Sequence, residues 1–269
     1  MVVSVARYLL DEAASGTTPT ECADDENSNT LTIDYSSGDA VWVEPASNKR
    51  GLDFTRSPAQ TDTAIAELAD ISTNGNVGSS LDSVTQASLL MVVTVENGSD
   101  LGARIFHIGT SSGNGDFGVI IQADGDVGVR WDNEGGGSGI EKVFTGPTWA
   151  GLQVIAVIID TPNATAALRM RVFVDDSELT GTGADITQNV AIDAVNATNR
   201  SICIGNRPSQ NRNIEGAIFY CELFTGILTA TEITDSKTAL LANNDADWQA
   251  GGGGGGLPAG SLSLMGVGI

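Results

Sequence analysis

The sequence is short of positive charge, histidine and cysteine. Its 269 residues include 13 Lys or Arg against 34 Asp or Glu, which gives a formal net charge of −21. A nucleic-acid backbone would be repelled by such a chain, so we expect no nucleic-acid partner. One histidine, His107, and three cysteines supply no Cys–His metal spacing and no disulfide framework. We therefore interpret the cysteines as buried free thiols and His107 as a structural residue.

Long apolar runs are also missing. No stretch approaches the ~18 apolar residues that a membrane-spanning helix needs, so we expect no membrane span. The first residues, Met1-Val-Val-Ser-Val, lack the basic segment that opens a secretion signal. That favours a protein released by lysis, such as a virion component, over a secreted adhesin.

Short runs rich in Val, Ile and Thr, separated by Gly, Asn, Asp and Ser, predict an all-β sandwich. Residues 88–95 are the most apolar run and suit a central strand buried on both faces. Asp124-Gly125 predicts a hairpin between the runs on either side. Residues 63–69 could form one or two helical turns. Thr229 as N-cap and Glu232 three residues later predict a helix to about Asn243.

Several segments, in this order, resemble the laminin-G-like, or concanavalin-A-like, jelly-roll family of lectins and glucanases. Residues 9–16 are similar to its L-D-E-x-S-G turn, residues 171–176 to L-Y-V-D-G, and residues 228–233 to L-S-x-x-E-I. The resemblance covers residues 5–240. It implies an antiparallel jelly-roll β-sandwich over residues 1–248, with a short C-terminal helix, followed by an extended glycine-rich tail over residues 249–269.

Catalysis is not expected. Glucanases of this fold carry E-x-D-x-x-E on one strand, so that paired carboxylates face one cleft. The sequence has no such motif, and Glu215 and Glu222 are spaced to lie on opposite faces of a strand. We therefore predict a protein that is not an enzyme.

The family's usual ion is calcium, bound by loop carboxylates and carbonyls. No cofactor is certain, but the resemblance makes Ca²⁺ the candidate, with Asp124, Asp126, Asp175 and Asp176 as ligands. The alternative is that these aspartates serve tight turns for backbone reasons.

Sugar binding needs an exposed aromatic ring beside polar side chains. Trp131, with Asp132 and Asn133 at a strand end, is the candidate ligand-binding patch, and packing of Trp131 in the core is the alternative. Trp42 and Trp149 are interpreted as core residues.

Six glycines, Gly251 to Gly256, precede an apolar end. Such a run has maximal backbone entropy, so we expect it to gain order only against a neighbouring subunit or, alternatively, its own domain. The predicted assembly residues are Gly251, Gly256, Leu257, Leu262, Leu264, Met265 and Ile269.

Our first functional hypothesis is a non-catalytic virion protein, a capsid decoration, head-fibre or tail-appendage subunit displayed on the virion surface of a bacteriophage. The tail would contact further copies or other virion proteins, and the domain could contact a cell-surface glycan. The alternatives are an extracellular or cell-surface carbohydrate-binding module or adhesin, and an extracellular filament subunit.

Overall fold

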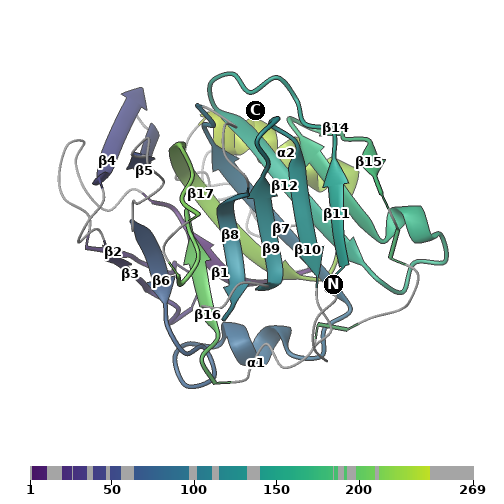
Figure 1. Ribbon diagram of the computed structural model, residues 1–269, viewed down its shortest axis with the longest axis horizontal. Coiled ribbons are helices and arrows are strands. Elements are labelled where there is room, and N and C mark those ends of the chain that lie inside the picture. Colours follow the sequence, from purple (N-terminus) through teal and green to yellow (C-terminus); the bar gives the residue numbers. More distant parts are fainter. Residues whose placement is uncertain are drawn as a thin grey trace, which may run out of the picture.

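The computed structural model shows two large β-sheets stacked face to face (Figure 1). It describes residues 2–10, 20–25, 27–34, 39–46, 49–55, 64–96, 102–110, 115–131, 140–183, 185–186, 191–192, 198–209 and 212–242. The predicted boundary at residue 248 and the tail lie outside these ranges.

The first sheet has eight strands in the order β14-β13-β12-β7-β17-β5-β4, with β1 also paired to β17. All its pairs are antiparallel. Its strands are β1 (Val3–Tyr8), β4 (Asp39–Ala46), β5 (Lys49–Thr55), β7 (Gln86–Val93), β12 (Gln153–Asp160), β13 (Met170–Val174), β14 (Ser177–Glu178) and β17 (Gly216–Thr225).

The second sheet has nine strands in the order β15-β11-β10-β9-β8-β16-β6-β3-β2, again antiparallel throughout. Its strands are β2 (Glu21–Cys22), β3 (Leu31–Asp34), β6 (Ile65–Leu68), β8 (Ala103–Gly109), β9 (Gly115–Ile121), β10 (Val127–Trp131), β11 (Ile140–Phe144), β15 (Gly181–Thr182) and β16 (Ser201–Ile204). Three helical segments complete the described chain, namely α1 (Val77–Leu81), the 3-10 turn η1 (Ala166–Leu168) and α2 (Ala230–Ala242).

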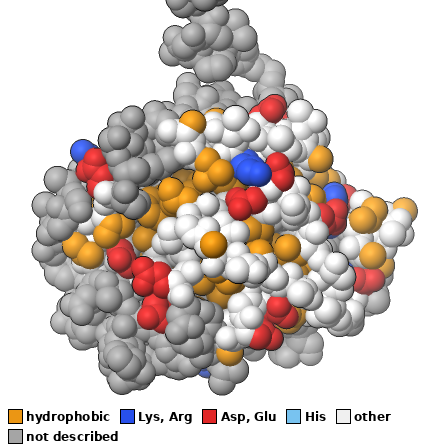
Figure 2. Space-filling model, turned by 90° about the horizontal axis from the view of Figure 1, so that it is seen from above, with side chains coloured by type: hydrophobic (Ala, Val, Ile, Leu, Met, Phe, Trp, Pro, Cys, Tyr) orange, Lys and Arg blue, Asp and Glu red, His pale blue; other side chains and the backbone are white. Residues whose placement is uncertain are grey.

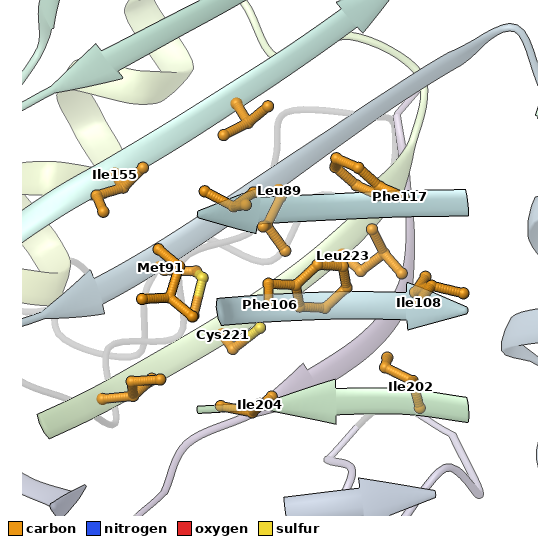
Figure 3. Close-up of a cluster of buried hydrophobic side chains, with 14 of the residues drawn as sticks. Leu89, Met91, Phe106, Ile108, Phe117, Ile155, Ile202, Ile204, Cys221 and Leu223 are labelled. Atoms are coloured by element: carbon orange, nitrogen blue, oxygen red, sulfur yellow. The ribbon is translucent and has the colours of Figure 1, made fainter. Parts of the chain in front are cut away.

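The main core fills the space between the sheets. Figure 3 shows side chains of β7, β12 and β17 pointing toward side chains of β8, β9 and β16. Alternate residues of each strand face this layer, as the period-two geometry of a strand requires. The architecture confirms the predicted all-β antiparallel jelly roll.

A second apolar cluster covers the outer face of the eight-stranded sheet. Strand residues such as Leu90, Val154 and Phe173 pack there with Ile233 and Leu240 of α2. The central strand β7 is therefore buried on both faces, which confirms the prediction for the run at residues 88–95. Burial on both sides explains why that run is continuously apolar rather than alternating.

Most local predictions hold. The hairpin between β9 and β10 forms at Asp124-Gly125, and the three cysteines are buried thiols that form no disulfide. The helical prediction for residues 63–69 is wrong, because Ile65–Leu68 forms β6 between β3 and β16. Pairing on both edges overrides a weak local helical preference. Neither α1 nor α2 has the length and apolar character needed to cross a bilayer.

The capping box of α2 supplies a stability test. Thr229 N–H donates to Glu232 Oε2 at 2.7 Å, and Glu232 N–H donates to Thr229 Oγ1 at 3.2 Å. Thr229→Ala should lower the free energy of unfolding by about 1 kcal/mol, because one cap acceptor is lost. Thr234→Ala, an exposed change inside the same helix, should be neutral or slightly stabilising. Urea denaturation measures both, and equal effects would contradict this role for the cap.

Candidate functional site

A pocket of about 690 Å³ opens on the eight-stranded sheet. We call it the carboxylate pocket, because three acidic residues line it. Its lining comes from β4, β5 and β17, from the segment after β7, and from the segment before β12. The lining residues are Val43, Glu44, Asp53, Thr94, Val95, Glu96, Trp149, Ala150, Gly151, Ala217 and Phe219.

Strand register brings these distant residues together. Asp53 pairs with Ala217 across β5 and β17, and Thr94 N–H donates to the Ala217 carbonyl at 2.8 Å. A Cβ on Gly51 would lie 2.5 Å from the ring of Phe219, so this ring packs directly over the Gly51 backbone. The lack of a side chain at Gly51 thus gives the ring of Phe219 its space.

Trp149 contributes the aromatic surface of the pocket. The side chain is half-buried, and its Nε1–H donates to the Gly125 carbonyl at 2.8 Å. A Cβ on Gly125 would come within 3.2 Å of the indole, and its φ of +87° also favours glycine. The β9–β10 hairpin therefore holds the ring in place. Trp149 is not simply the core residue that we predicted, since it packs against the core and also lines the pocket.

Asp53 is the most perturbed acid of the pocket. Burial, and second the nearby Glu96 carboxylate, together raise its pKa to about 6. The side chain is only half-buried, so a ligand in the pocket can reach it. A titratable group shifted by burial and a specific charged neighbour within a pocket is typical of a functional site.

The third acid, Glu44, has a basic partner beside it. Arg50 Nε lies 3.4 Å from Glu44 Oε2, and both side chains are partly exposed. Among the described residues that line the pocket there is no Lys or Arg. The face seen in Figure 2 has a similar character, with acidic side chains beside exposed hydrophobic ones and basic side chains more sparse.

Positive charge gathers instead on the nine-stranded sheet. Arg104 of β8 interacts electrostatically with Arg130 of β10 and with Arg207 and Arg212 of the segment after β16. Burial, and then Arg207, lower the pKa of Arg104 to about 10. We call these four residues the arginine cluster. It is built on the other sheet from the carboxylate pocket.

His107 lies among these arginines on β8, paired with Cys203 and Gly118. Its pKa is lowered to about 3, first by burial and then by the charge of Arg104. A fully buried, neutral imidazole fits the structural role that we predicted for it.

The predicted sugar platform at Trp131 is wrong. Its side chain is 0% exposed and packs edge to face on Phe117, with ring centroids 5.4 Å apart. Because Trp131 occupies an inward position of β10, it belongs to the main core, which was the alternative interpretation. Trp42 is also a core residue, as predicted. Asp132 and Asn133 lie outside the described residues.

The calcium candidates serve turns. Asp126 N–H donates to Asp124 Oδ1 at 3.2 Å, and Gly146 N–H donates to Asp126 Oδ1 at 2.7 Å. Asp175 and Asp176, with φ of +50° and +67°, form the two-residue β13–β14 turn, a conformation that Asp tolerates.

Both of these aspartates also have partners. Val154 N–H donates to Asp175 Oδ1 at 3.0 Å, and Lys237 Nζ lies 3.2 Å from Asp176 Oδ2. Within the described part of the chain, no group of three or more His, Cys, Asp or Glu residues could hold a metal ion. The turn alternative therefore accounts for these four aspartates, and the structure gives the calcium prediction no support.

The assembly prediction falls on residues that the structure does not describe: Gly251, Gly256, Leu257, Leu262, Leu264, Met265 and Ile269 all lie beyond residue 242. The sequence patterns did not point to Asp53, Glu96 or Trp149 as ligand-binding residues. The two acids lie on β5 and just after β7, so no single-strand motif could reveal them. The one available signal was an aspartate inside the apolar alternation at residues 51–55.

No protein-family model matches this chain, and no curated protein matches it. Solved structures do. The binding domain of botulinum neurotoxin DC in complex with rat synaptotagmin II has a TM-score of 0.59 at 8% identity, covering 88% of this chain and 51% of that one. A structure of botulinum neurotoxin type C, which depends on two ganglioside molecules to enter cells, gives 0.57 at 11% identity, with coverages of 88% and 51%.

The CBM40 of Ruminococcus gnavus IT-sialidase bound to alpha2,3 sialyllactose has a TM-score of 0.51 at 14% identity, covering 70% of this chain and 96% of that one. This chain spans about half the length of the neurotoxin structures. At these identities the likeness establishes a shared fold, the jelly-roll β-sandwich.

The raised pKa of Asp53 predicts a pH-dependent stability. Its folded-state value of about 6 exceeds the ordinary 3.8, so the folded protein holds this proton more tightly than the unfolded chain does. The resulting stabilisation is complete below pH 4 and is lost as the pH rises through 6. Asp53→Asn removes this dependence. Relative to wild type, the variant should gain roughly 1 kcal/mol between pH 4 and 7, a figure reduced for solvent screening.

Urea unfolding of both proteins across this pH range measures the difference. Glu21→Gln, an exposed change on β2, is the matched control and should follow the wild-type curve. Parallel curves for Asp53→Asn and wild type would contradict the shifted pKa.

Proposed function

We propose that this protein is a non-catalytic carbohydrate-binding module and that the carboxylate pocket holds the sugar. The observation that carries the proposal is the combination of half-buried Trp149 with Asp53 and Glu96 in one pocket. A sugar ring presents an apolar C–H face and a rim of hydroxyl donors. An aromatic surface suits the first, and carboxylate oxygens, as charged acceptors, suit the second.

The comparisons support this proposal. The CBM40 is bound to alpha2,3 sialyllactose, and the type C neurotoxin interacts with gangliosides. Both share the fold of this chain. A fold hosts many functions, so the comparisons raise the expectation of glycan binding while the pocket chemistry supplies the argument.

The virion hypothesis stays a prediction. It depends on a tail that the structure does not describe and on the first residues of the sequence. A glycan-binding domain displayed on a virion would also satisfy the proposal, as would one on a cell surface. Association with copies of itself or with other virion proteins is likewise a proposal, which purified particles could test.

Glycoside hydrolysis is the second candidate, and one observation favours it. Asp53 with a raised pKa beside Glu96 resembles the acid and base pair that glycosidases use. Release of reducing ends from an oligosaccharide library, lost in Asp53→Asn, would establish catalysis. Binding without any product would support the non-catalytic module.

Trp149 provides the test of the binding proposal. Trp149→Ala removes the aromatic surface and should weaken oligosaccharide binding by about tenfold or more. Trp149→Phe keeps a ring but loses the bond to Gly125, so it should retain most of the affinity. Leu168→Ala, which removes an exposed hydrophobic side chain elsewhere, is the control and should bind as wild type.

A glycan array followed by titration calorimetry on the hits measures these affinities, and circular dichroism checks folding of each variant. If folded Trp149→Ala bound every hit with the affinity of the wild type, the proposal would be overturned. It would also be overturned by the absence of any hit on a broad array.

A further inference from the structure

The charged side chains that line the carboxylate pocket in the described residues are all acidic. Glu44, Asp53 and Glu96 line it, and the described lining residues include no Lys or Arg. Arg50 contacts Glu44 and is not itself among the lining residues. Two acids of the pocket, Asp53 and Glu96, therefore repel one another without a basic residue between them in the described lining.

The position of Asp53 makes this repulsion costly. It stands on β5 between Val41 of β4 and Ala217 of β17, half-buried in the sheet. Ionising a carboxyl there means losing hydration and facing Glu96 at the same time. In the free protein a proton relieves both costs up to about pH 6. A cation bound in the pocket would relieve them at any pH.

The aromatic side of the pocket suits the same cation. The Trp149 N–H is committed to the Gly125 carbonyl, so this residue offers a ligand its π surface rather than a donor. Phe219 also belongs to the lining, but its side chain is buried, so Trp149 is the ring that a ligand can reach. A cation near the indole face is attracted by the ring quadrupole, in addition to the carboxylates. A bare metal ion suits the pocket less well, since no group of three or more His, Cys, Asp or Glu among the described residues could hold one.

We propose that the carboxylate pocket binds an ammonium-bearing saccharide, that is, an amino sugar with a free amine, in preference to neutral and acidic sugars. The inference deepens the proposed function and depends on it. The sugar ring would lie against Trp149, and its ammonium group would donate to Asp53 and Glu96. Glu44 would add attraction from the β4 side.

This preference differs from that of the sialyllactose-bound CBM40, whose ligand is acidic. A carboxylate on the sugar would face Asp53, Glu96 and Glu44 and would be repelled. An acidic sugar would instead find positive charge at the arginine cluster, on the other sheet. The two sites predict different ligands and different residues, so one set of measurements separates them.

The test compares three probes with the full chain at pH 6.5, using titration calorimetry. Tri-glucosamine and tri-N-acetylglucosamine share a backbone and differ in the amine charge, and sialyllactose supplies the acidic sugar. Tri-glucosamine should bind about tenfold or more tightly than its acetylated counterpart, and sialyllactose should not bind the pocket. Added salt should weaken only the tri-glucosamine complex strongly.

Substitutions test which residues cause the preference for the amine. Asp53→Asn and Glu96→Gln should each weaken tri-glucosamine binding by about tenfold and change the acetylated ligand little. Glu21→Gln also removes one acidic charge, but on the exposed edge strand β2 of the other sheet, and should change neither. If Glu21→Gln weakened tri-glucosamine binding as much as the pocket variants do, the ligand would be attracted by the overall negative charge of the protein. That result would overturn the inference.

The remaining outcomes are distinct. Equal or tighter binding of the acetylated trimer, still dependent on Trp149, would overturn the amine preference and leave the proposed function standing. If none of the three probes bound and the glycan array gave no hit, both the proposed function and the amine preference would be overturned. Sialyllactose binding lost in Arg104→Gln but kept in Asp53→Asn would assign sugar binding to the arginine cluster and overturn the role of the pocket.

Discussion

The structure depends on strands β7, β12 and β17 being buried on both faces. Their inner side chains pack against the nine-stranded sheet, and their outer ones pack with α2. Apolar burial of this kind, about 25 cal/mol for each Å² removed from water, is the dominant favourable term in folding. Phe219 and Ala217 belong both to the outer cluster and to the pocket lining. The carboxylate pocket thus borders the second apolar cluster, which supplies part of its lining.

Repulsion between two acidic side chains gives the carboxylate pocket its chemical character. A stable fold would gain by separating Asp53 from Glu96 or by placing a basic residue between them. The chain instead holds the pair in one pocket whose described lining has no Lys or Arg, and burial of Asp53 together with Glu96 raises the pKa of Asp53 to about 6. Like charges that are held close together without an opposite charge nearby are typical of functional sites. The arginine cluster gathers charge of the opposite sign, with the Glu141 carboxylate also acting on Arg104, and strand pairing places Arg104 and Arg130 in one sheet.

Patterns that act over a few residues predicted the fold well. The capping box at Thr229, the Asp-Gly hairpin and the apolar run of β7 all depend on neighbours along the chain, and all are confirmed. The order of such segments was enough for the jelly roll. The site could not be predicted in this way, because Asp53, Glu96 and Trp149 meet only through pairing of distant strands. The prediction for Trp131 was wrong because a tryptophan at a strand end has the same sequence pattern whether its ring faces the core or the solvent.

The most direct test of the account is the pKa of the Asp53 carboxyl, followed by side-chain carbon NMR with and without a saturating pocket ligand. The free protein should show a pKa of about 6. A ligand that donates to the carboxylate stabilises its charged form, so binding should lower this pKa, most strongly for an amine-bearing sugar. An ordinary pKa in the free protein, or a raised pKa unchanged by a sugar that binds, would contradict the assignment of this pocket as the binding site.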